Sequence, residues 1–143
     1  LDKMLVTRGH RFARYADDFI VMVASAKAAQ RVLKNLTGYV EGSLMKLVVN
    51  RTKSRSAPLR QCAFLGFQVG VNGKVVWANK VLKRFKMRIR QITSRNRGCH
   101  VRDVIDELRR YVTGWINYFG ISHSYKVVLR LDKWLRRRVR GYY

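Results

Sequence analysis

Two adjacent carboxylates are the side chains best suited to chemistry in this chain. Asp17 and Asp18 follow Tyr15 and Ala16 and precede the apolar run Phe19–Val23. Successive side chains of a strand point to opposite faces, so the carboxylates converge only in a tight turn between two strands. Such a pair repels itself, and a hard cation such as Mg²⁺ would relieve the repulsion. Two such ions can clamp the attacking and leaving oxygens of an in-line phosphoryl displacement.

The segments around the pair predict the elements that hold it. The runs Arg11–Arg14 and Phe19–Ala24 are short and β-favouring, which predicts a hairpin. The second run is continuously apolar, as is typical of a strand buried on both faces. Ser25 is expected to cap a helix that continues to about Gly42, and Leu1–Arg8 reads as the end of an earlier helix.

Further strands are predicted along the next forty residues. Lys46–Asn50 is typical of a short strand, and Arg60–Val71 of a strand with Gly66 at its centre. Asn72-Gly73 is a strong hairpin turn leading into the run Lys74–Trp77. These strands and the helix after Ser25 predict an α+β domain.

Three amphipathic helices are predicted after Asn79. Their apolar stripes are Leu82, Phe85, Ile89 and Ile92, then Val101, Val104, Ile105, Leu108, Val112, Trp115 and Phe119, then Val128, Leu131, Leu135 and Val139. One stripe on each helix predicts an all-α three-helix bundle. The sequence therefore divides into residues 1–78, with antiparallel strands and a helix, and residues 79–143.

Charge points to a polyanionic partner. The chain has 31 Lys+Arg and 8 Asp+Glu, a formal net charge of +23, yet 48% of its residues are hydrophobic. A folded domain of this charge most commonly binds nucleic acid, with an anionic membrane surface or an acidic protein as the alternatives. Residues 1–78 hold only four acids, and two of them are Asp17 and Asp18. This concentration favours a built site over the alternative, a solvated turn.

The sequence predicts neither a membrane span nor a zinc site. The chain has no run of eighteen apolar residues that would predict a membrane span. Cys62 and Cys99 form no C-x-x-C pair and the histidines are scattered, so zinc is not expected. Two unpaired cysteines fit a cytoplasmic location.

Four blocks in this order resemble one enzyme family. The run Arg14–Phe19 resembles the Tyr-Ala-Asp-Asp catalytic motif of reverse transcriptases, as found in group II intron and related bacterial enzymes. Asn50–Ser54 resembles the Asn-x-x-Lys-Ser/Thr block of that family, and Phe64–Phe67 resembles its next block. The stretch 84–143 resembles the group II intron maturase-specific domain, most closely in Ile105–Trp115, Asn117–Gly120 and Leu131–Arg138. The resemblance is to group II intron-encoded reverse transcriptase/maturases.

The resemblance implies both a function and a set of partners. The protein would be an RNA-directed DNA polymerase that also binds group II intron RNA to assist splicing and mobility. Its substrates would be dNTPs and an RNA template with a DNA primer, and its cofactor Mg²⁺. Residues 1–78 would form part of a reverse-transcriptase palm, and residues 79–143 the thumb and maturase-specific domain.

Individual roles follow from the same resemblance. Asp17 would ligate the metal directly, and Asp18 would belong to the same acidic cluster. Tyr15 would pack near the primer end. Lys53 falls at the family lysine that faces the active site, where its charge would stabilise developing phosphate charge.

The resemblance also implies primer and RNA contacts. Phe64, Gly66 and Phe67 would lie beside the primer, since a glycine in a strand often marks close approach of a ligand or backbone. The run 84–97 contains no acid, unlike an ordinary solvated face with both signs. The candidate phosphate contacts are Lys83, Arg84, Lys86, Arg88, Arg90, Arg136, Arg137, Arg138 and Arg140. Trp115, Trp134, Phe119 and Leu131 are expected in the core.

Two departures from the family pattern limit these expectations. The chemistry needs a third carboxylate from an earlier strand, and Asp2, in a predicted helix, does not suit that role. The fingers region is missing too, so we expect a piece of a longer enzyme, or a degenerate copy, that does not polymerise alone. The alternatives are a non-catalytic RNA-binding maturase and a retron-like reverse transcriptase. A palm without strand neighbours would be held by a partner chain or by self-association.

Overall fold

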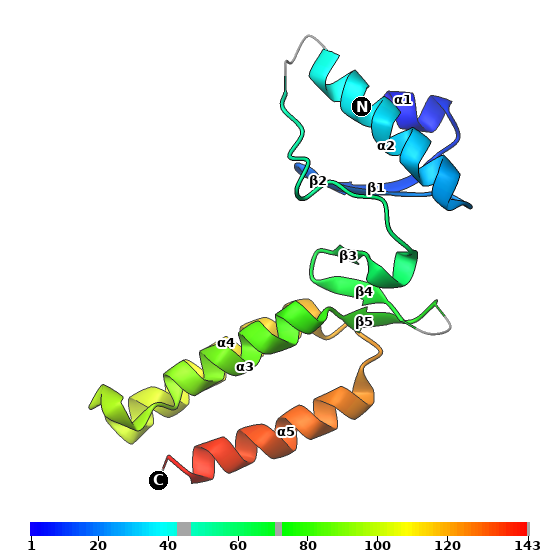
Figure 1. Ribbon diagram of the computed structural model, residues 1–143. Helices are drawn as coiled ribbons and strands as arrows, with labels where there is room; N and C mark the ends of the chain where they lie inside the picture. The colour runs from blue at the N-terminus through cyan, green and yellow to red at the C-terminus, as the bar shows by residue number, and fades with distance from the viewer. Residues whose placement is uncertain (43–46, 71–72, 143) are drawn as a thin grey trace. The chain divides into compact units, whose positions relative to one another are not determined.

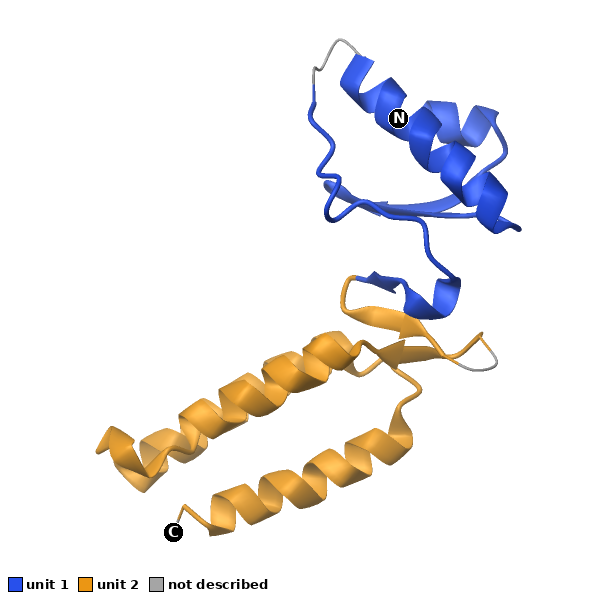
Figure 2. Ribbon diagram, in the orientation of Figure 1, with its two compact units in different colours: residues 1–64 blue, residues 65–143 orange. Residues whose placement is uncertain are grey.

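The chain folds into two compact units. A computed structural model describes residues 1–42, 47–70 and 73–142 and divides them into Leu1–Phe64 (unit 1) and Leu65–Tyr143 (unit 2), coloured separately in Figure 2. The domain boundary predicted after residue 78 rests on the change in sequence pattern there. It stays a prediction, and it differs from the boundary between the two compact units. The structure combines antiparallel sheets with helices, which confirms the α+β class.

Unit 1 is built around the predicted hairpin (Figure 1). Its elements are α1 (Asp2–Thr7), β1 (Arg11–Tyr15), β2 (Asp18–Met22), α2 (Ala26–Gly42), the 3₁₀ turn η1 (Leu59–Gln61) and β3 (Ala63–Phe64). Strands β1 and β2 pair antiparallel, with Tyr15 opposite Asp18. The Ser25 hydroxyl accepts a hydrogen bond from the backbone N–H of Ala28 at 3.2 Å. Both the hairpin and the helix cap are therefore confirmed.

Two strand predictions in unit 1 were wrong. Strand β2 is not buried on both faces, because Phe19 and Met22, which point to opposite faces, are 40% and 47% exposed. Leu47–Asn50 forms no strand, while Lys46 lies outside the described residues. Instead the Asn50 side-chain carbonyl accepts hydrogen bonds from the backbone N–H groups of Thr52 and Lys53, both at 3.1 Å. This is the local side-chain bonding by which asparagine favours turns.

Unit 2 begins with a turn where the sequence predicted the middle of a strand. Leu65 and Gly66 have φ angles of 51° and 85°, so the chain turns there instead of continuing as a strand through Arg60–Val71. Strand β4 (Phe67–Val69) then pairs antiparallel with β5 (Val75–Trp77). Val71 and Asn72, which belong to the predicted strand end and turn, lie outside the described residues, whereas Gly73 lies inside them.

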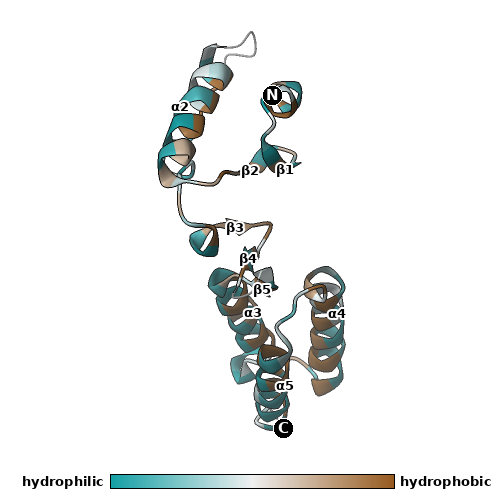
Figure 3. Ribbon diagram, turned by 90° about the vertical axis from the view of Figure 1, so that its right-hand side faces the viewer, coloured by the Kyte–Doolittle hydropathy of each residue, from teal (hydrophilic) through white to brown (hydrophobic). Residues whose placement is uncertain are grey.

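Three helices make up most of unit 2, as predicted. They are α3 (Asn79–Ile92), α4 (Val101–Phe119) and α5 (Tyr125–Arg140), with a short 3₁₀ turn η3 (Arg95–Arg97) between the first two. Figure 3 shows polar and apolar residues interleaved along all three, as amphipathic helices require. None of the described helices is long and apolar enough to cross a membrane.

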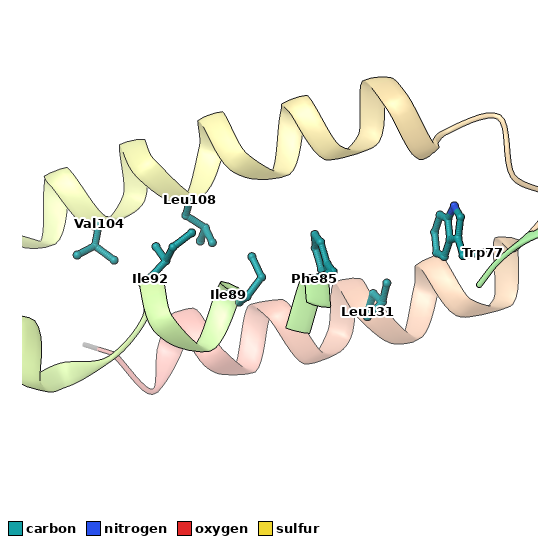
Figure 4. Packing of buried hydrophobic residues seen from close by; sticks show 7 residues of the cluster. All are labelled: Trp77, Phe85, Ile89, Ile92, Val104, Leu108 and Leu131. Atoms are coloured by element: carbon teal, nitrogen blue, oxygen red, sulfur yellow. The ribbon is translucent and has the colours of Figure 1, made fainter. Parts of the chain in front are cut away.

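The core of unit 2 draws on all three helices and on β5. Figure 4 shows its buried members, which are Trp77, Phe85, Ile89, Ile92, Val104, Leu108 and Leu131. Trp115, Phe119 and Trp134 are partly buried against this cluster, so the core positions predicted for them and for Leu131 are confirmed. The three-helix bundle is confirmed in part, because β5 contributes Trp77 to the same core.

Candidate nucleic-acid interface

The aspartate pair lies at the tip of the unit 1 hairpin. Ala16 and Asp17 form the turn, and Asp18 is the first residue of β2. Ala16 adopts a φ of 54°, which is uncommon for a residue with a side chain. Asp17 and Asp18 are exposed, and Tyr15, opposite Asp18 in the ladder, is 67% exposed. A solvated cation can therefore reach both carboxylates without displacing protein side chains.

An arginine ties this turn to α1. The Arg14 guanidinium lies 2.9 Å from a carboxylate oxygen of Asp2 and donates to the Ala16 carbonyl at 3.4 Å. The Asp2 carboxylate is thus engaged by Arg14. Among the described residues, no three His, Cys, Asp or Glu side chains gather as metal ligands. Asp17 and Asp18 fit Mg²⁺ as hard oxygen ligands, since that ion is usually held by one or two carboxylates together with substrate phosphates.

The other predicted palm residues lie in different surroundings. Lys53 is exposed in the turn that Asn50 shapes. Phe64 is half-buried at the end of β3. The roles predicted for Lys53 and Phe64 stay predictions.

Gly66 is in close contact with the helices of its own unit. A Cβ atom placed there would lie 2.9 Å from a ring carbon of Phe119 and 3.0 Å from a methyl carbon of Val81. The Phe67 ring packs on Phe119 with centroids 5.3 Å apart. The lack of a side chain at Gly66 is therefore explained by internal packing, and its primer contact and that of Phe67 stay predictions.

The acids of unit 2 are mostly paired with its cations. Residues 65–143 contain 19 Lys+Arg and 4 Asp+Glu, a difference of +15. Glu107 binds Arg88 at 3.0 Å and Arg97 at 2.8 Å, and its hydrogen bond raises the pKa of the Arg97 guanidinium. Asp106 lies 3.9 Å from Arg109. The remaining cations are therefore a large unbalanced excess.

Several arginines and lysines predicted to bind RNA also make contacts inside unit 2. On α3, the Lys86 ammonium and the Arg90 guanidinium each lie 5.8 Å from the Trp134 ring, within cation–π range. Arg88 is held by Glu107. Lys83 and Arg84 are exposed. The α3 cations are thus divided between packing against α5 and facing solvent.

The α5 arginines divide in the same way. Arg138 is partly buried and donates to the Thr93 hydroxyl at 2.9 Å and to the Thr93 carbonyl at 3.2 Å, which joins α5 to the end of α3. Arg136 pairs with Asp132 at 2.9 Å. Arg137 and Arg140 are exposed. These contacts describe the free chain, and the RNA contacts predicted for the four arginines stay predictions.

One row of cations follows the solvent-facing side of α5. Its members, hereafter the α5 basic stripe, are Lys126, Arg130, Lys133, Arg137 and Arg140, all of them exposed. Steps of four, three, four and three residues keep them on one helix face, largely opposite the buried Leu131. The stripe extends over about 20 Å, from 1.5 Å of rise per residue. Sequence reasoning missed Lys126, Arg130 and Lys133, although their helical spacing carried the signal.

The exposed face of α4 offers a contrast. An open hollow of about 420 Å³ there is lined by Asp103, Asp106, Arg109 and Arg110. Because carboxylates and guanidinium groups share this face, it lacks the single sign of the α5 basic stripe. It is less suited to a phosphate backbone.

Comparison with known families gives a match within unit 2. Residues 82–143 match the family model of the group II intron maturase-specific domain. No match was found among curated proteins. The family match supports a maturase-like identity for α3, α4 and α5, and with it a function linked to RNA binding and splicing. The hairpin of unit 1 lies outside the matched residues.

Proposed function

We propose that unit 2 binds group II intron RNA through the α5 basic stripe and thereby assists splicing. The stripe is the observation that carries this proposal: five exposed cations lie on one face of α5, without an acid among them. Cations one helical turn apart are about 5–6 Å from each other, so they can bind successive phosphates of a backbone lying along the helix. Each phosphate neutralised releases counterions, which makes such binding strongly dependent on salt.

The test compares two triple variants of the full chain. Arg130→Gln, Lys133→Gln and Arg137→Gln together should weaken binding to a group II intron RNA and reduce the slope of log affinity against log salt by about 2–3. The matched control removes the same charge from the mixed-sign face of α4 through Arg102→Gln, Arg109→Gln and Arg110→Gln, since the exposed Arg102 lines a second hollow there with Asp106 and Arg109. If both variants lost the same RNA affinity, binding would depend only on the net charge of the protein, and the stripe proposal would fail.

We further propose that the hairpin serves RNA-directed DNA polymerisation in the intact enzyme. Asp17 and Asp18 would hold Mg²⁺, which supplies charge stabilisation for the in-line attack on a dNTP. Tyr15, exposed opposite Asp18, would pack beside the primer end, and Lys53 would stabilise negative charge on the phosphates. The order of blocks along the chain supports this proposal, together with the exposure of both carboxylates at a tight turn.

The rival is a maturase without polymerase chemistry. It is favoured by the lack of a third metal-binding side chain near Asp17 among the described residues. In the intact protein, Asp17→Ala with Asp18→Ala should abolish cDNA synthesis and leave splicing of the intron unchanged. If the double variant still makes cDNA, the polymerase proposal fails. The chain alone should not extend a primed RNA template with Mg²⁺ and dNTPs.

A further inference from the structure

An exposed aromatic ring stands at the beginning of the α5 basic stripe. Tyr125 is the first residue of α5 and is 71% exposed, directly before Lys126. Leu129, one turn later, is 45% exposed, and Ile121 before the helix is 70% exposed. Tyr125 and Leu129 thus form an apolar row next to the cationic row of Lys126 and Arg130. The ring and the cations one turn along the helix are therefore close enough to contact the same ligand.

The backbone beneath this ring is held firmly. The N–H of His123 donates to the Val75 carbonyl at 2.9 Å, which ties the α4–α5 connection to β5. The Ser122 and Ser124 hydroxyls hydrogen-bond each other at 2.7 Å, and Ser124 is 8% exposed. The Ser124 carbonyl accepts the first helical bonds of α5. The Tyr125 ring therefore projects from an ordered support, which lowers the entropic cost of binding to it.

The surroundings of the ring select its partner. Unpaired RNA bases stack on exposed aromatic side chains, and adjacent cations bind the flanking phosphates. Lys126 and Arg130 provide those cations beside Tyr125. A purely apolar protein partner would leave both charges unpaired. Charge complementarity therefore favours RNA as the occupant.

We propose that Tyr125 is a stacking platform for an unpaired base of an RNA whose backbone follows the α5 basic stripe. This inference rests on the proposed RNA binding by unit 2 and names the form of RNA that it prefers. The preferred ligand carries unpaired nucleotides beside the segment that lies along α5. Blunt duplex RNA lacks an accessible base face, and it would bind through the stripe alone.

The experiment uses the full chain and two RNAs. One is a hairpin with a four-nucleotide adenosine overhang, and the other is the same hairpin with a blunt end. The wild type should bind the overhang hairpin about tenfold more tightly, from the usual worth of one base–aromatic stack. Tyr125→Ala should remove this preference and leave blunt-end binding unchanged. Tyr125→Phe keeps the ring and should retain the preference. The triple variant Arg130→Gln, Lys133→Gln and Arg137→Gln should weaken binding to both RNAs.

A second measurement does not depend on affinity. With 5-iodouridine in the overhang, near-ultraviolet light should crosslink the RNA to Tyr125, and mass spectrometry would locate the crosslink. Tyr39→Ala, at an exposed tyrosine of α2, is the matched control and should leave the crosslink unchanged. Equal affinity of the wild type for both hairpins, or an overhang preference that survives Tyr125→Ala, would overturn the stacking platform alone. No binding to either RNA would overturn the proposed RNA binding by unit 2 and this inference with it.

Discussion

The two units differ in how far each contains what its predicted role requires. Unit 1 carries the carboxylate pair, yet among its described residues only Leu5 and Leu36 are buried hydrophobics. Unit 2 buries a cluster of seven residues, and its α3, α4 and α5 present cations on the outside. A binding surface for phosphates needs only charges on a stable scaffold. A polymerase centre needs several carboxylates converging on metal ions, a more demanding geometry.

The contrast indicates which role each unit can perform from its own residues. The α5 basic stripe is complete within a single helix, so it depends only on the core that holds that helix. The hairpin presents two carboxylates and no third ligand among the described residues. We therefore expect RNA binding from this chain, and catalysis only where another carboxylate joins Asp17 and Asp18.

The largest expected effect tests whether unit 2 is stable by itself. Ile89 is fully buried, and Ile89→Ala should lower the free energy of unfolding by about 2–5 kcal/mol. All three tryptophans, Trp77, Trp115 and Trp134, lie in unit 2, so denaturant unfolding followed by tryptophan fluorescence reports on that unit. Leu5→Ala removes an equally buried side chain from unit 1 and should leave this transition in place. If Leu5→Ala shifted the tryptophan transition as much as Ile89→Ala does, the two units would unfold together and unit 2 would not be independently stable.

A smaller effect is expected where the turn at Gly66 packs on α4. Gly66→Ala adds a Cβ that overlaps Phe119 at a φ of 85°, and it should cost about 2–4 kcal/mol. Gly98 is the matched control, because its φ of 61° is also left-handed but no atom lies within 4 Å of an added Cβ. Gly98→Ala should cost about 1 kcal/mol from backbone strain alone. Similar losses in thermal unfolding for the two variants would contradict the packing explanation.

The smallest expected effect separates two neighbouring arginines of α5. Arg138→Gln should lower the free energy of unfolding by about 1–2 kcal/mol, because it removes charge-assisted hydrogen bonds to Thr93. Arg137→Gln should change that free energy by less than about 0.5 kcal/mol, since its side chain is exposed. RNA affinity should show the reverse order, with the greater loss for Arg137→Gln. If Arg138→Gln weakens RNA binding more at unchanged stability, the division of the α5 arginines is wrong.

The elements whose signals are local could be predicted from the amino-acid sequence. Helical periodicity from Leu82 to Val139 predicted α3, α4 and α5, because amphipathic helices repeat their apolar residues every three to four positions. The Tyr15–Asp18 turn between two β-favouring runs predicted the hairpin, because a turn and its flanking strands are neighbours in sequence. The capping role of Ser25 depends on neighbours within three residues, and it was predicted correctly.

Features that depend on partners distant in sequence became visible in the folded chain. Arg137 and Arg138 look alike in sequence, yet Arg138 binds Thr93 at the end of α3, while Arg137 is exposed. The apolar run of β2 predicted burial, but burial depends on what packs against a strand, and Phe19 and Met22 stay 40% and 47% exposed. Position 66 requires a glycine because Phe119, distant in sequence, occupies the space a side chain would need. Local sequence encodes backbone preference, whereas burial and pairing are set by residues that meet only after folding.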